Sequence, residues 1–312
     1  MSKEKVSFAE AFTVQRRETD LDRLLGMIRW QRLRYRLEKI VARSKEGRPA
    51  YDALKMFKAL LLQRFYDLSD RQIEECLYDR FSFRRFCSFG LDEALPDATT
   101  LLRFRQALGG KTQSLLDLVN EELRSMGVQM GQGAIVDATI IRSSAKTPKA
   151  GEVSDVDPEA GWTKKNGDSI HGYKSHTCVE EVNGLVQATV ATGADVHDSQ
   201  VFGALLTGEE TAVYGDKAYG SAANRQRLVQ TGTKDCLLYK ASKKQPLTSW
   251  QRWLNKLYGP IRQTIERTFS HWKGVLGLCR ARYGGWAKNQ VHFDLLAMAY
   301  TLRRSLKLIP SG

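Results

Sequence analysis

Residues Gly131 to Arg142 read GQGAIVDATIIR, a short apolar run that carries one acid, Asp137, near its middle. The β-branched content of this run predicts a strand. It also marks a change of pattern, because the chain before about residue 128 looks helical and strand-like runs begin only here. An acid in or beside a strand is most often structural, so Asp137 acquires meaning only from the rest of the chain.

Two later stretches resemble this one in carrying an acid beside an apolar pattern. Thr211 to Asp216 reads TAVYGD, a second apolar run that ends in an acid and is followed by Lys217. Pro260 to Lys273 reads PIRQTIERTFSHWK, a predicted helix that carries Glu266. The three acids are far apart in sequence, so only folding can bring them together.

The charge balance points to a polyanionic partner. The chain has 312 residues, 48 Lys and Arg against 35 Asp and Glu, and a net charge of +13. Nucleic acid is the commonest partner of such a protein, and a merely soluble basic protein is the alternative. No apolar stretch reaches the length of a membrane span, and the first residues lack a signal-peptide core, so we expect no membrane partner. The five cysteines form no CxxC pair and indicate a reduced, cytosolic protein.

The first 128 residues are predicted to form a helical domain. Residues Asp20 to Ala42 place apolar side chains at helical spacing and arginines, including Arg32 and Arg36, between them. Phosphate contact and a solvated basic face are equally compatible with this pattern. A break at Gly47-Arg48-Pro49 precedes a predicted helix over Asp52 to Phe65.

Two further helix starts carry local signals. Ser69 and Gln72 form a potential capping box, and the short link before Ser69 is typical of a helix-turn-helix unit or of an ordinary bundle. Another helix is expected to start at Asp97 and to carry Arg103 and Arg105. The basic charge of this half favours DNA binding, and we expect the half to serve in DNA binding and in dimerisation.

A glycine-rich segment, Met126 to Gly133, marks the predicted boundary, so residues 1–128 and 129–312 are expected to be separate domains. Asn166-Gly167 and Asn183-Gly184 are hairpin signals within the second domain. The expected element order is β-β-β-α-β-α-β-α, a mixed sheet with helices on its faces. The fold class is therefore α/β, preceded by an all-α domain.

In such a sheet the first and fourth strands can lie side by side, which would bring Asp137 and Asp216 to one edge. Glu266 lies at the border of the apolar stripe of its helix, with Arg262 and Lys273 on the same charged stripe. Gathered carboxylates favour Mg²⁺, and two such ions catalyse phosphoryl transfer. Arg262 and Lys273 are then candidates to hold phosphates, and an Arg262 to Glu266 ion pair within the helix is the alternative.

With these motifs the chain resembles the DDE transposases of bacterial insertion sequences, specifically the IS5 group, which have a ribonuclease H-like catalytic domain. The matching pieces in the second half are VDATIIR, WTKKNGDSIHGYKSH, ATGADVHDSQ, YGDKAYGS and RQTIERTFSHWKGVLGLCRARYGG. In the first half they are GRPAYDALKMFKALLLQRFYDLSDRQIEE and PDATTLLRFRQAL. The likeness extends from about Gly47 to Leu302.

The resemblance implies that Asp137, Asp216 and Glu266 bind two Mg²⁺ ions, for which Mn²⁺ substitutes. The family signature Tyr-x2-Arg-x3-Glu-x6-Lys matches at Arg262, Glu266 and Lys273, whereas its first position falls on Gly259, with Tyr258 one residue early. Lys174 and Lys217 are phosphate contacts by position.

His197-Asp198 is interpreted as a helix cap, with Asp198 or Ser199 expected to cap a helix that runs through Leu206. Trp250 and Trp253 are core residues or stacking platforms for an unpaired base.

The resemblance further implies a transposase that binds double-stranded DNA at terminal inverted repeats, cleaves there and joins 3′-hydroxyls to target DNA. A homodimer in the synaptic complex and a place in the bacterial cytoplasm, on the nucleoid, are expected. A structure-selective nuclease of the same fold and a catalytically inactive DNA-binding regulator are the alternatives.

Overall fold

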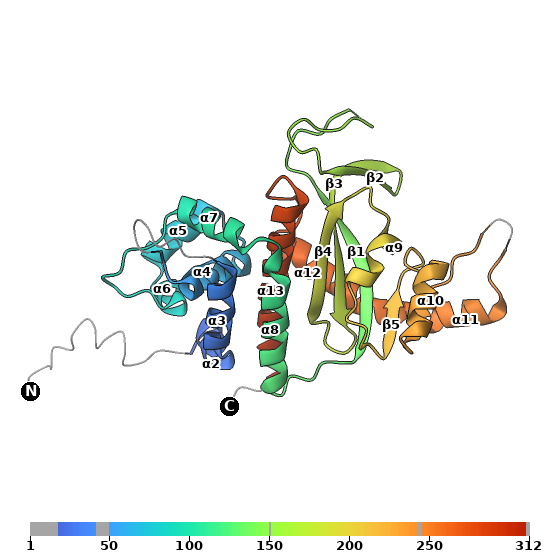
Figure 1. The fold of residues 1–312 in the computed structure, drawn as a ribbon, viewed down its shortest axis with the longest axis horizontal. Coiled ribbons are helices and arrows are strands. Elements are labelled where there is room, and N and C mark those ends of the chain that lie inside the picture. Colours follow the sequence, from blue (N-terminus) through green and yellow to red (C-terminus); the bar gives the residue numbers. More distant parts are fainter. Residues whose placement is uncertain (1–17, 42–49, 150, 243–244, 310–312) are drawn as a thin grey trace, which may run out of the picture.

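The computed structural model describes residues 18–41, 50–149, 151–242 and 245–309. Figure 1 shows a group of helices at one end of the molecule, then the long helices α8 and α13, and then a sheet with further helices beyond it. The helices of the N-terminal half are α2 (Asp20–Met27), α3 (Trp30–Ile40), α4 (Ala53–Phe65), α5 (Asp70–Asp79), α6 (Phe81–Cys87), α7 (Ala98–Leu108) and α8 (Gln113–Ser125).

Helices α4, α5 and α7 begin where the sequence predicts. Ser69 accepts a hydrogen bond from the Gln72 backbone, and the Gln72 side chain accepts one from the Ser69 backbone, so the capping box is confirmed. Asp52 and Asp97 cap α4 and α7. Such caps satisfy N–H groups that have no partner within the helix. The predicted break at residues 47–49 lies outside the described residues.

The predicted single helix over Asp20 to Ala42 is wrong, because the chain forms two helices, α2 and α3, in this stretch. Ile28 between them is extended, with φ −112° and ψ 132°. The buried carboxylate of Glu122 on α8 accepts hydrogen bonds from Arg29 N at 3.3 Å and from Arg29 Nε at 2.8 Å. A tertiary partner therefore satisfies the backbone where the helix stops. Ala42 is outside the described residues.

A six-stranded mixed sheet forms the second half of the chain. The strands are β1 (Gly133–Arg142), β2 (Gly161–Lys165), β3 (Asp168–Glu180), β4 (Val186–Gly193), β5 (Ala212–Gly215) and β6 (Lys234–Leu237). Their order is β2-β3-β1-β5-β6, and β4 also pairs with β3. β3 is antiparallel to each of its neighbours β1, β2 and β4, whereas β1, β5 and β6 are mutually parallel.

The predicted hairpin at Asn166-Gly167 is confirmed, since both residues have positive φ, 54° and 90°, as a type I′ turn requires. The sequence predicts three strands before the first helix of this half, and the structure has four, β1 to β4, before α9 (Asp198–Val201). The additional strand, β2, pairs with residues 168–172 of β3, and β4 pairs with residues 173–179 of the same strand. A long β3 thus accommodates two short partners along one edge.

Helices cover both faces of the sheet. They are α9 (Asp198–Val201), α10 (Ala222–Gln230), α11 (Ser249–Tyr258), α12 (Gln263–Gly274) and α13 (Trp286–Ser305). Successive residues of a strand point to opposite faces. Ile135 of β1 accordingly packs with α12 and α13, whereas Val136 packs with Phe202 and Leu228 on the α9 and α10 side. The predicted α/β fold class, with a helical region before the sheet, is confirmed.

α13 lies at the centre of the molecule, between the N-terminal helices and the sheet (Figure 1). One apolar core includes α4 and α8 before residue 128 and α12 and α13 after it. Asn120 of α8 also donates to the Val186 carbonyl at the sheet edge, at 2.9 Å. The boundary at residues 128 and 129 stays a prediction, and the core is continuous across it. Among the described helices, none is both long and apolar enough to cross a bilayer.

A buried acid on α13 joins three elements. Asp294 Oδ1 accepts hydrogen bonds from Thr189 of β4 and from Gln290, at 2.5 and 2.9 Å, and Oδ2 accepts one from Thr112 before α8. Removal of this carboxyl from water raises its pKa to about 6, although the three hydrogen bonds act in the opposite direction. Burial therefore favours the neutral form of Asp294 more than water does, and the carboxyl ionises as pH rises through about 6.

Asp294 is expected to make stability depend on pH. Because its folded pKa exceeds the unfolded one, its contribution is fully present below about pH 4 and is lost as pH rises through about 6, a change of roughly 3 kcal/mol. Asp294→Asn removes this dependence. Urea unfolding of both proteins at about pH 4 and about pH 7 measures it, and an equal difference between the two proteins at both pH values would contradict the assignment.

Candidate active site

Asp137 and Asp216 lie at neighbouring positions of two parallel strands. Asp137 is in the middle of β1, and Asp216 directly follows β5. In the register of these strands Val136 is opposite Gly215, so each acid comes one residue after a paired position. The predicted adjacency of the two strands is confirmed.

The side chain of Asp137 lies on the α12 face of the sheet. It alternates with Ala138 and so shares its face with Ile135 and Ile141, both of which belong to the core formed with α12. The carboxylate is 18 % exposed, which leaves it at the border of that core. A helix that crosses this face can therefore place side chains against the acid.

Arg262 connects the two acids. Its Nη2 donates to Asp137 Oδ2 at 2.7 Å, and its Nη1 lies 3.8 Å from Asp216 Oδ1. Arg262 ends a 3₁₀ turn, η3 (Gly259–Arg262), which leads directly into α12. The predicted helix over Pro260 to Leu276 thus begins as a tighter turn. The alternative ion pair between Arg262 and Glu266 is not formed among the described contacts.

The charged form of Asp137 is disfavoured even though Arg262 pairs with it. Burial raises the pKa of Asp137, Arg262 lowers it, and the nearby Asp216 raises it further. Two carboxylates share one guanidinium, so the negative charge of the pair exceeds the positive charge that faces it. Such a pair attracts additional positive charge.

Glu266 lies on the same stripe of α12 as two residues that reach the acid-bearing part of the sheet. Arg262 contacts Asp137, and Lys273 Nζ donates to the Ile140 carbonyl of β1 at 3.2 Å. Glu266 is four residues after Arg262 and seven before Lys273, spacings that share one helix face. It is exposed and, among the described residues, has no hydrogen-bond or ion-pair partner. Its carboxylate is therefore not held in place by another described side chain.

The carboxylate oxygens of Asp137 and Asp216 suit a hard cation. The guanidinium of Arg262, which faces both acids, marks the position of such a positive charge. Asp137 and Asp216 offer only oxygen donors, the type that Mg²⁺ prefers. Within the described residues no three His, Cys, Asp or Glu side chains are already gathered closely enough to hold a metal ion. With Glu266 turned inward, Asp137, Asp216 and Glu266 would hold it. The chemical fit is good, and the gathered set requires side-chain movement.

The two lysines predicted to contact phosphate have different surroundings. Lys174 of β3 is largely buried, and its Nζ donates to Asp198 Oδ1 at 2.9 Å and to the Val196 carbonyl at 2.7 Å. Its charge is used inside the protein, so phosphate contact by Lys174 is not supported. Lys217 is exposed beside Asp216, and its backbone N–H donates to the Asp216 carboxylate at 2.7 Å. Lys217 remains available for DNA.

A polar cluster next to Asp216 was not predicted. Tyr219 donates a backbone hydrogen bond to the Asp216 carbonyl at 2.9 Å, and its hydroxyl lies 3.5 Å from His176 Nδ1. Burial lowers the pKa of His176 to about 4, so this ring is neutral near pH 7. Lys174 and His176 are two residues apart on β3, a spacing that places both side chains on one face of the sheet. This spacing is the feature of the sequence from which the cluster could be predicted.

His197 caps α9, because its Nδ1 accepts a hydrogen bond from the Ser199 N–H at 3.3 Å. The interpretation of this segment as a cap is thus confirmed, but the expectation that Asp198 or Ser199 caps is wrong. Asp198 is the first residue of the helix and pairs with Lys174 instead. Its carboxylate therefore fastens α9 to β3.

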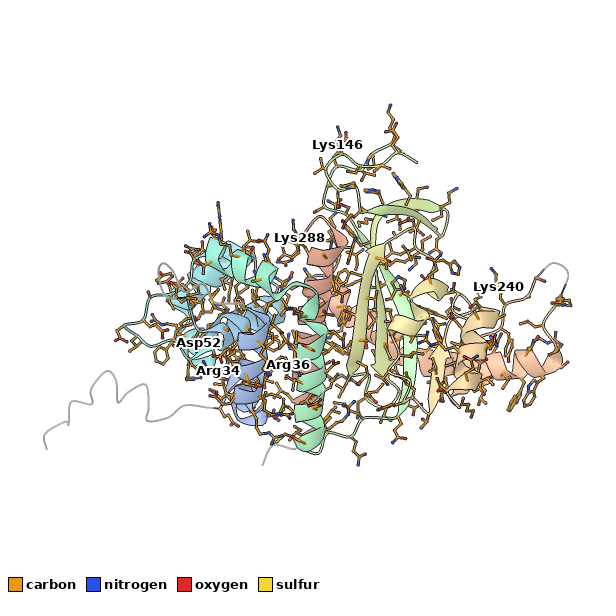
Figure 2. The ribbon with its side chains drawn as sticks, in the orientation of Figure 1. Arg34, Arg36, Asp52, Lys146, Lys240 and Lys288 are labelled. Atoms are coloured by element: carbon orange, nitrogen blue, oxygen red, sulfur yellow. The ribbon has the colours of Figure 1, made fainter. Side chains whose placement is uncertain are left out.

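The arginines of the N-terminal half divide into those that pair with acids of the protein and those that have no such partner among the described residues. Arg32 pairs with Glu121 and Glu122 of α8, at 3.0 and 2.5 Å, so its charge is largely used within the protein. Arg34 likewise pairs with Asp52 (Figure 2). Arg36, on the next turn of α3, is exposed. A role in DNA binding therefore fits Arg36 better than Arg32.

Arg105 is a structural residue, which contradicts its predicted role in DNA binding. It is 4 % exposed, pairs with both carboxylate oxygens of Asp70 at 2.7 and 2.8 Å, and lies over the ring of Tyr283 at 4.5 Å. Its neighbour Arg103 is exposed. DNA contact remains a prediction for Arg103 alone of the two.

Trp250 and Trp253 are not core residues. Their rings stack on each other with centroids 4.7 Å apart, and the residues are 63 % and 51 % exposed on the outer side of α11. α11 is instead held by Leu254 and Tyr258, which pack against β6. The interpretation as core residues is wrong, and stacking on an unpaired base stays a prediction.

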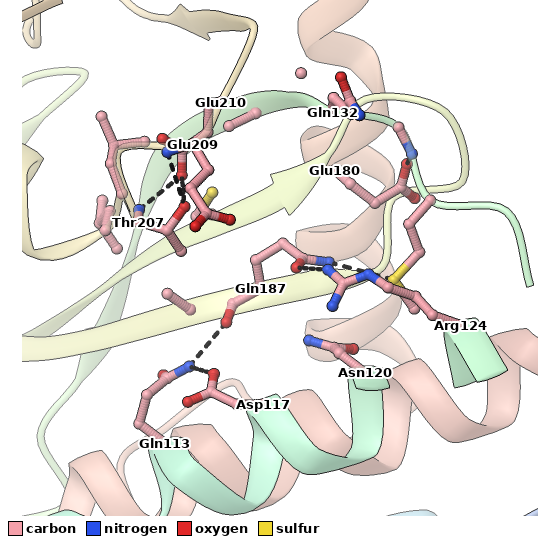
Figure 3. A pocket seen from close by; sticks show the side chains of 18 of the residues that line it. Gln113, Asp117, Asn120, Arg124, Gln132, Glu180, Gln187, Thr207, Glu209 and Glu210 are labelled. Atoms are coloured by element: carbon pink, nitrogen blue, oxygen red, sulfur yellow. Dashed lines mark hydrogen bonds between the residues drawn. The ribbon is translucent and has the colours of Figure 1, made fainter. Parts of the chain in front are cut away.

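A hollow of about 760 Å³ lies between α8 and the start of β1, away from the middle of the strand (Figure 3). Its lining includes Asp117, Glu209 and Glu210, while Arg124 is bonded to Gln187. Acids in this number repel phosphate. The hollow is therefore unsuited to DNA, and the paired acids of β1 and β5 are the better candidate site.

The sheet order and its helical layers define a ribonuclease H-like fold. A family model described as a transposase DDE domain matches residues 129–302, and a transposase domain (DUF772) matches residues 10–107. The first match covers more than half of the chain, so this protein belongs to the DDE transposase family.

Solved transposase structures show a distant likeness. A piggyBac transposase synaptic complex with hairpin DNA is 9 % identical, with a TM-score of 0.43, over 90 % of this chain and 71 % of that chain. The Mos1 mariner paired end complex with Mn is 12 % identical, with a TM-score of 0.22, over 88 % of this chain and 91 % of that chain.

Proposed function

We propose that this DDE transposase belongs to the IS5 group, binds the terminal inverted repeats of an insertion sequence, cleaves at these ends and joins the 3′-hydroxyls to target DNA. The observation that carries the proposal is the pair of acids on adjacent parallel strands, bridged by Arg262. Family membership and the net charge of +13 support a polyanionic substrate.

The residues of the chain have separate tasks in this reaction. Asp137, Asp216 and Glu266 would hold two Mg²⁺ ions, with Mn²⁺ as a substitute, and the ions would supply activation of the attacking oxygen and stabilisation of the departing one. Arg262 at the end of η3 and Lys273 on α12 flank Glu266 and orient the scissile phosphate. Lys217 is exposed next to Asp216 and adds a contact to the DNA backbone.

Double-stranded DNA is the proposed partner, and two copies of the protein would hold two element ends in one complex. The homodimer rests on the need to recognise both ends. The corresponding place of action is the bacterial cytoplasm, on the nucleoid. Exposed Trp250 and Trp253 would supply a stacking surface for an unpaired base.

The experiment that tests the function supplies purified protein with Mg²⁺, labelled DNA that carries the ends of the element, and a supercoiled target. Joined product is expected. Cleavage without joining would instead identify a structure-selective nuclease, and tight binding without chemistry would identify a regulator.

Arg103→Ala is expected to weaken DNA binding and to lower the slope of log affinity against log salt by about 1, because one phosphate contact is lost. Arg103→Lys, which keeps the charge, is the matched control and should preserve most of the slope. Binding measured at several salt concentrations provides both values. An unchanged slope for Arg103→Ala would show that this side chain does not contact phosphate.

A further inference from the structure

Arg262 occupies the place that a catalytic cation would take. Its guanidinium contacts Asp137 at 2.7 Å and faces Asp216 at 3.8 Å, and these are two of the three acids to which the proposed function assigns the metal. Among the described residues no other Lys or Arg side chain pairs with either acid, since Lys174 pairs with Asp198 and Lys273 donates to a backbone carbonyl. The cation that now partly offsets the charge of this pair is therefore a side chain of the protein.

The guanidinium of Arg262 makes only some of the hydrogen bonds that it could make. Its Nε is buried and has no hydrogen-bond partner, and its approach to Asp216 is longer than a hydrogen bond. A buried donor without a partner has a free-energy cost. A ligand that offers the acids a higher charge density can therefore replace this guanidinium.

The local backbone allows such a replacement. Arg262 ends the short 3₁₀ turn η3, between α11 and α12, and such turns between helices often mark hinges. Gly259 begins the turn with open space around its Cα. The side chain of Arg262 is 15 % exposed, so part of it already reaches solvent.

We propose that Arg262 is a built-in counter-ion, which holds Asp137 and Asp216 together in the metal-free protein and competes with the metal for the same carboxylates. This inference rests on the proposed function. In this proposal the metal can bind the two acids only when Arg262 leaves them, so the two events occur together. When metal is bound, the released guanidinium is available to bind a DNA phosphate. When metal is absent, the guanidinium remains paired with the two acids.

A titration with Mn²⁺ in the absence of DNA tests the competition, with free Mn²⁺ followed by its electron paramagnetic resonance. Arg262→Gln is expected to bind Mn²⁺ about tenfold more tightly than the wild type, since the competing charge is removed. Arg267→Gln is the matched control, because Arg267 lies on the same helix and bonds to the Gln263 carbonyl. It should change the affinity less than about twofold. Equal or weaker binding by Arg262→Gln would overturn the proposal.

A second measurement uses the wild-type protein and so does not depend on the folding of a variant. Phenylglyoxal modifies accessible arginines, and peptide mass spectrometry gives the rate at each position. Adding Mn²⁺ is expected to speed modification of Arg262 severalfold while that of exposed Arg267 stays constant. A rate at Arg262 that is unchanged or slower with Mn²⁺ would refute the exchange.

The two tests separate the inference from the function on which it rests. If Asp137→Asn abolishes Mn²⁺ binding but Arg262→Gln does not tighten it, the metal site stands and the counter-ion role fails. If the wild type binds Mn²⁺ no better than Asp137→Asn does, the proposed metal site itself fails and the inference fails with it.

Discussion

Asp137→Asn is expected to lower both cleavage and joining at least about a thousandfold while leaving DNA affinity within about twofold. A metal ligand stabilises the charge of the transition state by several kcal/mol, and each 1.36 kcal/mol corresponds to a factor of ten in rate. The replacement keeps the shape of the side chain, and Asp137 lies at the border of the core rather than within it. Gel-shift affinity and single-turnover rates measure the two effects.

The matched control is Asp168→Asn, the same substitution at an exposed acid at the start of β3. It should retain the wild-type rates. Thermal unfolding of Asp137→Asn should show a cooperative transition, which excludes loss of the fold as the cause. A parallel loss of binding and chemistry in Asp137→Asn would show that this acid is structural and not catalytic.

Arg105→Ala is expected to lower the free energy of unfolding by roughly 3–5 kcal/mol, the usual effect of removing one partner from a buried ion pair. The carboxylate of Asp70 would lose both of its hydrogen bonds from Arg105, and Gln63 would lose one more. The ring of Tyr283 would also lose the guanidinium that covers it. Urea unfolding followed by circular dichroism measures the change.

Arg103→Ala is the control for this effect, because Arg103 lies two residues away and is exposed. Its unfolding free energy should stay within about 0.5 kcal/mol of the wild type. The two variants therefore show opposite behaviour: Arg105→Ala affects stability, and Arg103→Ala affects the salt dependence of DNA binding. Unfolding of Arg105→Ala at the wild-type urea concentration would contradict its structural role.

Local signals predicted much of the fold. The capping box at Ser69 and Gln72 and the type I′ turn at Asn166-Gly167 depend on neighbouring residues alone, and both are present as expected. The position of Asp137 beside Asp216 followed from the order of elements, since a parallel pairing of the two acid-bearing strands leaves few alternatives. These inferences needed no knowledge of side-chain contacts.

Contacts between distant segments were harder to predict. Arg262 has a local partner in Glu266 at helical spacing, yet the 3₁₀ turn directs it to Asp137 instead. Charge alone predicts that Arg105 contacts DNA, although Leu101 and Leu108 place it on an apolar stripe at i−4 and i+3. That spacing was present in the sequence and indicates burial with a partner acid.

The outer face of α11 shows a limit of hydrophobic patterning. Trp250 and Trp253 are three residues apart, as core residues often are, but the buried side of the helix carries Leu254 and Tyr258. When a helix has two apolar stripes, sequence periodicity identifies both but does not show which of them packs on the sheet. Packing against β6 decides it, and this is a property of the whole fold.

The central claim is that Asp137, Asp216 and Glu266 catalyse DNA strand transfer with a divalent metal. Its most direct test is a joining reaction with labelled DNA carrying the ends of the element and either Mg²⁺ or Mn²⁺, with wild type and Asp216→Asn compared at equal DNA occupancy. Metal-dependent joined product from the wild type, absent in Asp216→Asn, is the predicted result. Joined product at the wild-type rate from Asp216→Asn would contradict the claim.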